Sequence, residues 1–421
     1  MTSTRPRAQA LTKERTATSK AGRILPVSLA GAAVFGAFLG FSRLSYGLLL
    51  PAIHGDLSGS YAAFGDVGSA NLAGYLGGTL VLPLLLLRVA DRRRLNLAAL
   101  LVMNVALGAA ATSTDLLQLG VWRFLTGFAS GPAAVLTLAL VLGRVPPERR
   151  GMVSGLIWAG GAIGMVVSAL VGPLLAAAPH LHAWRLVWVC MAVLGLAASA
   201  ALHLALREPA LRTPARPAAN GPAAARLSLL RPPLLWLAGA YAVFGAGYIV
   251  YFTFVVALLV RQGVPPAAAS FAWALLGIAG AVGGIAWGRS VDGPAQRFAL
   301  AGALACGALG GLSVLTRSLP IELAGAVIIG SASFGVPSIV TALVRRAIAD
   351  ERSYTATFSL LTAALGVGQV AGPVAAGLVI DAGGLIAGTA LSGFVLLVGA
   401  MLAAGYGLAS RTTMIEVRGS S

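Results

Sequence analysis

The sequence predicts an all-α integral membrane protein with twelve transmembrane helices in two pseudo-symmetric bundles of six. Three observations indicate this class: an apolar composition, apolar segments of membrane-spanning length, and sequence matches between the two halves. Of the 421 residues, 58% are hydrophobic and 10% are charged, and the mean hydropathy is +0.87. A soluble domain is about a quarter charged. The composition therefore indicates a polytopic membrane protein.

Twelve segments are long and apolar enough to cross a hydrocarbon core of about 30 Å, which takes about 20 helical residues. We expect them at 24–53, 61–87, 95–113, 116–143, 151–177, 184–206, 233–260, 267–288, 298–316, 321–344, 354–380 and 384–409. The first apolar run is too long for the core of a signal peptide and contains no small-residue cleavage site. We therefore interpret it as an uncleaved first helix.

The formal net charge of +17 could indicate nucleic-acid binding, but the basic residues lie in short clusters between the apolar segments. If both termini and every second loop are placed on one side, that side receives 25 of the 30 Lys and Arg, and the opposite side receives three. Positively charged loops are retained in the cytoplasm. We therefore expect a multi-pass protein of the bacterial inner (plasma) membrane with cytoplasmic termini and no nucleic-acid partner.

A stretch rich in Pro, Ala and Arg at 207–232 divides the chain into two units and has the composition of a flexible cytoplasmic linker. The expected domains are a basic N-terminal tail at 1–23, bundles at 24–206 and 233–409, and a C-terminal tail at 410–421. Short matches recur in the same order: VFGA at 34–37 and 243–246, GFASG at 127–131 and GSASFG at 330–335, VGP at 171–173 and AGP at 371–373. They indicate an internal repeat.

Several motifs resemble the major facilitator superfamily. RVADRRR after the second span keeps Asp91, Arg92 and Arg94 of the family's loop motif but lacks its glycines, and GRSVDG keeps Gly288 and Asp292 of the second copy but lacks the following Arg. RFLTGFASGPA, which begins at Arg123, matches the fourth-span motif. GFSRLSYGLLLPAI, SANLAGYLGG and GYIVYFTFVVALLV are similar to the YbfB/YjiJ-like branch.

This resemblance implies the major facilitator fold and a secondary transporter. In such transporters the two bundles rock around a site near the membrane midplane, and spans one, four, seven and ten line the cavity. It also implies that the two loop motifs take part in gating. Glycine allows close helix contact and proline permits bending, so we add Gly172, Pro173, Gly372 and Pro373 as gating candidates. Tight membrane packing explains the small residues of span five equally well. The Gly-Pro of span five resembles drug and proton antiporters, which suggests export.

Arg43 and Arg123 lie inside spans, about 15 Å and about 12 Å from the expected outer ends of their helices. Two guanidinium groups at one depth predict an anion site, because each can bind carboxylate or phosphate through paired hydrogen bonds. For Arg123 the alternative is a structural bond to backbone at a helix kink. For Arg43 it is an ion pair with Asp66, an in-span carboxylate and therefore also our candidate for ion coupling.

Other polar side chains within spans are further candidates for substrate contact: Tyr46, Asn71, Tyr75, Tyr248, Tyr251, Thr253 and Gln369. A tyrosine ring with one polar end suits a cavity, but also a membrane interface. Tyr248 and Tyr251 are three residues apart and are expected to share a helix face. The two amides could instead bond neighbouring helices.

The sequence contains no catalytic constellation, metal-ligand spacing or phosphate-binding loop, so we expect neither an enzyme nor a cofactor or metal. The leading hypothesis is a secondary active transporter that moves a small organic solute, an anion in the first instance, by alternating access. It would act as a monomer among membrane lipids, with protons as a candidate coupling ion. The alternatives are a proton-coupled exporter of hydrophobic drugs or metabolites with structural arginines, and a non-transporting receptor or assembly partner.

Overall fold

The computed structural model describes residues 24–89, 91–146, 149–176, 183–207, 232–291, 296–348 and 351–419, with side chains omitted at 171–176, 232, 351–353, 355–356 and 411–419. The expected tail at 1–23, nearly all of the expected linker, and Asp292 lie outside these ranges. The C-terminal tail expected from residue 410 continues the last helix to Gly419.

The described chain is built from helices. The first membrane segment, Ile24–Asp56, contains the π-helix η1 (Gly36–Leu44) and α2 (Ser45–Asp56). The longer helices that follow are α3 (Tyr61–Arg88), α4 (Arg92–Ala109), α5 (Leu116–Leu142), α6 (Arg150–Ala176), α7 (Ala183–Ala205), α9 (Pro232–Arg261), α10 (Pro266–Ser290), α11 (Ala299–Leu312), α12 (Leu319–Ala347) and α13 (Glu351–Gly419). Short 3₁₀ turns η2 (Ala110–Thr112), η4 (Gln296–Phe298) and η5 (Ser313–Thr316) adjoin α4 and α11.

Within the described residues, eleven helical segments are long and apolar enough to span a membrane, where the sequence predicted twelve. The difference lies in α13, which contains both of the last two expected spans. Gly384, with φ 85° and ψ 167°, interrupts its helical geometry between those spans. The positive φ is accessible to glycine at little cost, so the chain turns there without leaving a loop.

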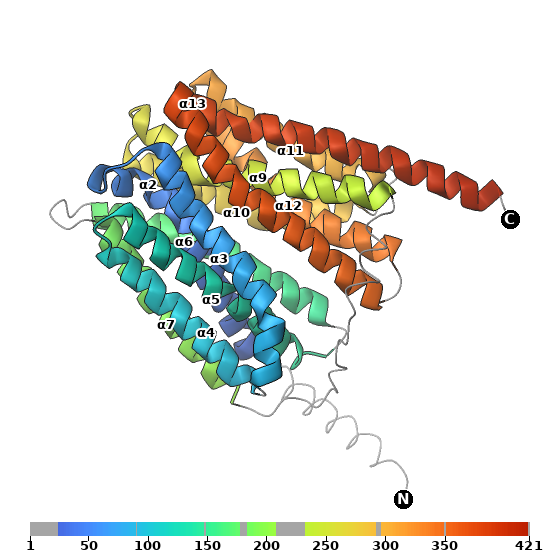
Figure 1. Ribbon diagram of the computed structural model, residues 1–421, viewed down its shortest axis with the longest axis horizontal. Coiled ribbons are helices and arrows are strands. Elements are labelled where there is room, and N and C mark those ends of the chain that lie inside the picture. The colour runs from blue at the N-terminus through green and yellow to red at the C-terminus, as the bar shows by residue number, and fades with distance from the viewer. Residues whose placement is uncertain are drawn as a thin grey trace, which may run out of the picture.

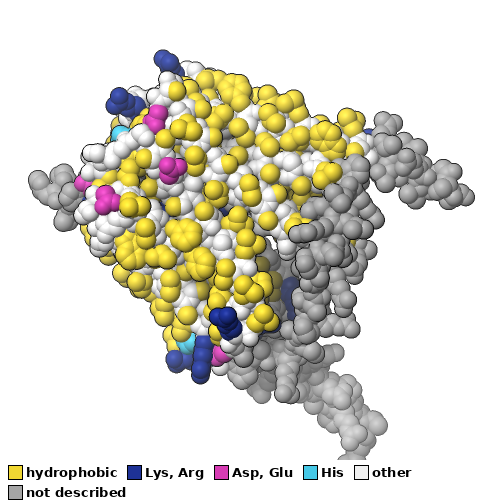
Figure 2. Space-filling view, viewed as in Figure 1, with side chains coloured by type: hydrophobic (Ala, Val, Ile, Leu, Met, Phe, Trp, Pro, Cys, Tyr) yellow, Lys and Arg dark blue, Asp and Glu magenta, His cyan; other side chains and the backbone are white. Residues whose placement is uncertain are grey.

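Figure 1 shows the helices of residues 24–205, which we call the first half, gathered on one side, and those of residues 232–419, the second half, on the other. Contacts between the halves join α2 to α9, α3 to α13 and α6 to α10. Figure 2 shows a face covered largely by hydrophobic side chains, with charged side chains near its ends. Exposed residues such as Leu80 and Leu170, each more than 60% exposed, suit contact with lipid.

The seam between the halves brings backbone against backbone at glycines. A Cβ atom at Gly47 of α2 would lie 1.9 Å from the carbonyl oxygen of Phe252 in α9. One at Gly65 of α3 would lie 2.3 Å from the carbonyl oxygen of Pro373 in α13. Any larger residue at these positions would push the halves apart, so the seam depends on glycine in the way membrane helix pairs commonly do.

One end of this seam is fastened by a carboxylate of the second half. Asp381 accepts hydrogen bonds from the backbone N–H groups of Tyr61, at 2.8 Å, and Ala62, at 3.0 Å. These are the first residues of α3, whose N–H groups have no partner within their own helix. We call this contact the Asp381 clasp. A carboxylate at a helix N-terminus also interacts favourably with the helix dipole.

The predicted gating residues have different structural surroundings. Asp91 caps α4 by accepting from the N–H groups of Arg93 and Arg94, and it pairs with the Arg94 side chain at 3.1 Å. Arg92 is exposed. A Cβ at Gly372 would lie 2.6 Å from the Ala246 carbonyl oxygen, so this glycine serves α9–α13 packing inside the second half.

The remaining gating candidates are less informative in this structure. A Cβ at Gly288 would make only an ordinary contact, 3.7 Å from Ser338. Gly172 and Pro173 belong to the part of α6 where the helical backbone alone is described. A role in gating therefore stays a prediction for all of these residues.

Candidate functional site

The site is organised by the π-helix η1, whose last turn carries Arg43. π-Helical turns are rare and concentrate at functional sites. The wider turn also changes which backbone groups are paired, and two carbonyl oxygens of this turn, those of Ser42 and Arg43, accept side-chain hydrogen bonds from α5. The irregular backbone is therefore satisfied from a neighbouring helix, as a membrane interior requires.

Arg123 of α5 supplies both of these hydrogen bonds. Its Nη1 donates to the Ser42 carbonyl at 2.5 Å and its Nη2 to the Arg43 carbonyl at 3.2 Å. The side chain is only 1% exposed, and its guanidinium group lies over the rings of Tyr46 and Trp188, at 5.1 and 5.8 Å. This arrangement corresponds to the structural bond to backbone that was the predicted alternative to an anion contact for Arg123.

Arg43 has different surroundings. It is half-buried, lies over the Tyr75 ring at 4.7 Å, and donates through Nη2 to Oε1 of Gln369 in α13. The Gln369 amide in turn donates to the Tyr248 hydroxyl in α9 at 2.6 Å. Arg43, Tyr75, Tyr248 and Gln369, which we call the central polar cluster, were all predicted as site residues. They come from four helices and join the two halves.

The ion pair considered between Arg43 and Asp66 is absent. Asp66 is exposed and forms no ion pair with any residue that the structure describes. Gly65 and Ser69 of α3 face α13, where the Ser69 hydroxyl donates to the Val370 carbonyl at 2.7 Å. Each residue turns a helix by about 100°, so Asp66 is rotated away from this seam.

The other predicted contacts divide between the site and the surrounding packing. The Tyr46 hydroxyl donates to the Phe64 carbonyl at 2.6 Å, and the Asn71 amide donates to the Arg123 carbonyl at 3.0 Å, so both join helices of the first half. Tyr251 is fully buried within electrostatic range of Glu322 in α12, whereas Tyr248 stacks on Phe244 and reaches Gln369. The two tyrosines therefore have different neighbours in this structure, and a joint role in substrate contact stays a prediction.

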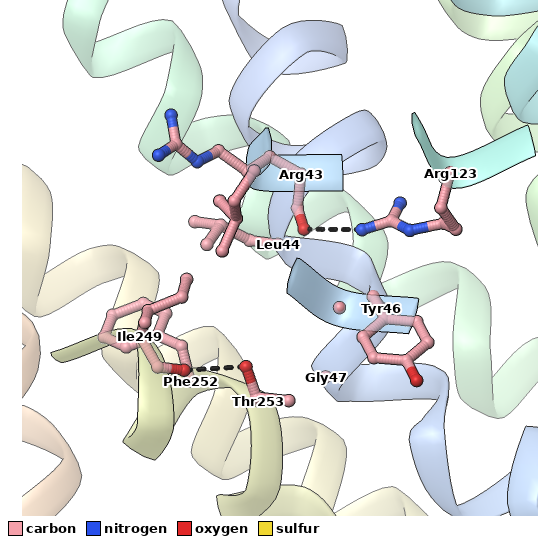
Figure 3. A pocket seen from close by; sticks show the side chains of 10 residues that line it. Arg43, Leu44, Tyr46, Gly47, Arg123, Ile249, Phe252 and Thr253 are labelled. Atoms are coloured by element: carbon pink, nitrogen blue, oxygen red, sulfur yellow. Dashed lines mark hydrogen bonds between the residues drawn. The ribbon is translucent and has the colours of Figure 1, made fainter. Parts of the chain in front are cut away.

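A small pocket lies beside η1, lined by residues of η1, α2, α3, α5 and α9, including Arg43, Tyr46, Arg123 and Thr253. Figure 3 shows how the two arginines lie around it: the Arg43 carbonyl faces the Arg123 guanidinium, while the Arg43 side chain points away from it. The two guanidinium groups therefore do not converge on one ligand position in this structure. No group of three His, Cys, Asp or Glu in the described ranges could hold a metal ion.

Comparison with known proteins gives the chain its family. Residues 36–404 match the family model described as "Uncharacterised MFS-type transporter YbfB". The chain is 28% identical over 358 residues to a "Chloramphenicol resistance protein" from Streptomyces lividans, covering 84% of this chain and 88% of that protein.

Solved structures share the fold. A bacterial homolog of the human lysosomal transporter Spinster, in an inward-facing and occupied conformation, superposes with a TM-score of 0.70 at 18% identity over 92% of this chain and 96% of that one. The nucleoside transporter NupG gives 0.70 at 12% identity over 93% and 99%. The resemblance drawn from the motifs is confirmed: the chain is a multi-pass membrane protein, not an enzyme, and it belongs to the YbfB-type transporters of the major facilitator superfamily.

Proposed function

We propose that this protein is a secondary active transporter of the bacterial inner membrane that moves a small organic anion by alternating access. The observation that carries the proposal is the central polar cluster, because it places one half-buried guanidinium group between the two halves, and no carboxylate in the described part of the chain pairs with it. A cation at membrane depth requires a partner. An anionic substrate would supply the charge that the protein does not.

The donor groups of Arg43 leave capacity for such a substrate. A guanidinium group has five N–H donors, and the described contacts of Arg43 are the bond to Gln369 and the Tyr75 ring. Its Nε is buried and, like the Nε of Arg123, has no hydrogen-bond partner among the described residues. Arg43 is therefore our proposed anion contact, with Tyr75, Tyr248 and Gln369 beside it. Arg123 takes a positioning role, because both of its terminal nitrogens already hold the backbone that carries Arg43.

Alternating access requires two bundles that separate at one end while they close at the other. In the proposed architecture the two parts of α13 are the eleventh and twelfth spans, which gives six spans to each half and places both termini in the cytoplasm. The Asp381 clasp would then lie on the outer side, so the structure is closed toward the outside. The clasp and the glycine seam must open for the substrate to exchange there.

A second candidate function is export of aromatic amphipathic compounds. Stacked rings flank the central polar cluster in both halves: Phe38 against Tyr75 at 5.7 Å, and Phe244 against Tyr248 at 4.9 Å. Rings of this kind favour stacking with a flat apolar substrate. The name of the Streptomyces relative is consistent with drug export. For proton-coupled export of this kind, Asp66 remains a candidate proton-binding residue.

A binding screen on purified protein separates the two candidates. We would measure the melting temperature with benzoate, acetate and phosphate, and with neutral aromatics such as benzamide and chloramphenicol, for the native protein and for Arg43→Gln. Stabilisation by anions that is lost in Arg43→Gln supports the anion transporter. Stabilisation by neutral aromatics that persists in Arg43→Gln, without any response to anions, overturns it in favour of the second candidate.

A proteoliposome assay then tests transport itself. Liposomes that contain the native protein should exchange external labelled benzoate for internal benzoate faster than empty liposomes. Binding without exchange, for all of the compounds in the screen, would support a receptor and contradict the transporter.

A further inference from the structure

Glu322 is a buried carboxyl group that the central polar cluster does not use. It lies in the first turn of α12, and its side chain is 2% exposed. One carboxyl oxygen, Oε1, accepts a hydrogen bond from the Gln262 amide at 3.0 Å. The other, Oε2, is buried and has no hydrogen-bond partner. Such an atom is rare in a folded protein and calls for a physical explanation.

No basic side chain in the described ranges forms an ion pair with this carboxyl group. The helices around it contribute Tyr251 from α9 and Ser313 from η5, whose hydroxyl donates to the Gly310 carbonyl. The basic residues of the adjacent turns, Arg261 and Arg317, are exposed, and neither pairs with Glu322 in the described structure. Arg261 instead acts electrostatically on His54 and Tyr61 of the first half. Among the described residues, Tyr251 is the titratable side chain that interacts electrostatically with Glu322.

These surroundings favour the neutral form of the carboxyl group. An ionised carboxylate removed from water needs an opposite charge or several donors, and Glu322 has one neutral amide donor. The first turn of a helix favours negative charge, but this effect is small compared with the loss of hydration. A protonated carboxyl group avoids the charge.

We propose that Glu322 is a proton-binding site of this transporter, occupied while the Asp381 end of the molecule is closed. Opening that end brings water to the first turn of α12. The O–H bond of the carboxyl group then breaks, the proton passes to a water molecule, and the carboxylate remains with its electron pair. The reverse transfer from hydronium reloads the site before the end closes.

The site is connected to the central polar cluster through α9. Tyr248 of that helix bonds Gln369, Tyr251 faces Glu322 one turn further on, and Gln262 follows the end of the helix. A change of charge at Glu322 therefore acts on the helix that carries part of the substrate site. This coupling rests on the proposed transport function, whereas occupation of Glu322 by a proton does not.

Infrared spectroscopy tests the occupation directly. Purified protein at neutral pH should show the C=O stretching band of a protonated carboxyl group, shifted on transfer to D₂O. The band should be lost in Glu322→Gln, an isosteric change that keeps the partner for Gln262. The matched control is Asp66→Asn, which removes the exposed in-span carboxylate and should leave the band in place. A native spectrum without the band, or a band that survives in Glu322→Gln, overturns the proposal.

A transport assay tests the coupling with benzoate as the probe. In proteoliposomes, Glu322→Gln should keep benzoate exchange and lose at least about tenfold of the accumulation that a pH gradient drives. Unchanged gradient-driven accumulation in this variant overturns the coupling. If the native protein does not move benzoate, the substrate assignment fails, and the infrared result still decides whether Glu322 holds a proton.

Discussion

The surroundings of Arg43 and Arg123 differ, although both arginines lie inside membrane helices of the first half. Arg123 is almost fully buried and bonds backbone of its own half, over the rings of Tyr46 and Trp188. Arg43 is half-buried and bonds a side chain of the other half. A contact inside one half persists when the halves move, whereas a contact between them changes.

This difference teaches that depth in the membrane does not define the role of a charge. The desolvation of Arg123 is offset by two carbonyl groups that a π-helical turn presents to it. The desolvation of Arg43 is offset by one neutral amide and one aromatic face. Both terminal nitrogens of Arg123 are engaged, whereas only Nη2 of Arg43 donates a hydrogen bond in the described structure, and the Nε of each arginine is buried without a partner there. Four substitutions test this distinction, in decreasing order of expected effect.

Arg123→Gln should mainly reduce stability. The shorter neutral side chain leaves the Ser42 and Arg43 carbonyls without their donor, and an unsatisfied buried polar group costs about 1–3 kcal/mol. With two such groups we expect a loss of about 2–6 kcal/mol, seen as a lower melting temperature and poor yield of folded protein in detergent. Arg123→Lys is the control and should recover only part of this, because one ammonium group does not reproduce the fork. Native stability in Arg123→Gln would contradict the positioning role.

Arg43→Gln should instead reduce binding with little effect on folding. If the substrate anion accepts a charged hydrogen bond worth about 1.5–3 kcal/mol, the dissociation constant rises about 10–100-fold. Isothermal titration of the anion found in the screen measures this on protein whose folding has been verified. An unchanged dissociation constant for that anion would exclude Arg43 from the binding site. Arg43 would then have a structural role, like Arg123.

The positions of the membrane segments could be predicted closely from the sequence, because the length and hydropathy of a span are local properties. The second span was expected at 61–87 and α3 is Tyr61–Arg88, and the fourth was expected at 116–143 and α5 is Leu116–Leu142. The tight turn at Gly384 could not be predicted, since it leaves no loop residues between the last two spans that a hydropathy pattern would register.

The partners of side chains could be predicted only in part. All four members of the central polar cluster were candidates, because polar residues in an apolar helix are few. The sequence did not indicate which candidates belong to the cluster and which do not. Packing around α9 gives Tyr251 different neighbours from Tyr248, and the contact of Gly65 with α13 turns Asp66 away from the seam. Glu322 was missed because it lies at a helix end, where a carboxylate normally reaches water. Its burial and its bond to Gln262 depend on how α9 and α12 pack.

The Asp381 clasp extends the comparison to the ends of the molecule. Asp381→Asn removes the charge that bonds the N-terminus of α3, so the closed arrangement of the halves should lose about 1–2 kcal/mol relative to the open one, as for removal of a helix cap. Spin labels at residues 58 and 267, which are exposed in the two halves at this end, should report a larger population of long distances.

The matched control for the clasp is Asp115→Asn. Asp115 caps α5 in the same way, by accepting from the Gln118 N–H at 2.8 Å, but within one half. Its loss should lower the melting temperature slightly and leave the label distances unchanged. Equal distance changes in the two variants would mean that Asp381 is an ordinary helix cap rather than a contact that holds the halves together.

Tyr248→Phe should give the smallest effect and test how the second half supports Arg43. The change keeps the ring that stacks on Phe244 and removes only the hydroxyl that accepts from the Gln369 amide. Gln369 then loses one of the two bonds that orient it, and its carbonyl oxygen no longer holds Arg43 in a fixed position. A neutral hydrogen bond is worth about 0.5–1.5 kcal/mol, so the dissociation constant for the anion should rise about 2–10-fold while the melting temperature stays the same.

Tyr251→Phe is the matched control, since it removes a hydroxyl one turn further along the same helix but outside the cluster. It should leave the anion affinity unchanged. If Tyr251→Phe weakened binding as much as Tyr248→Phe, the second half would act on Arg43 through general packing of α9 and not through the chain of hydrogen bonds from Tyr248 to Gln369.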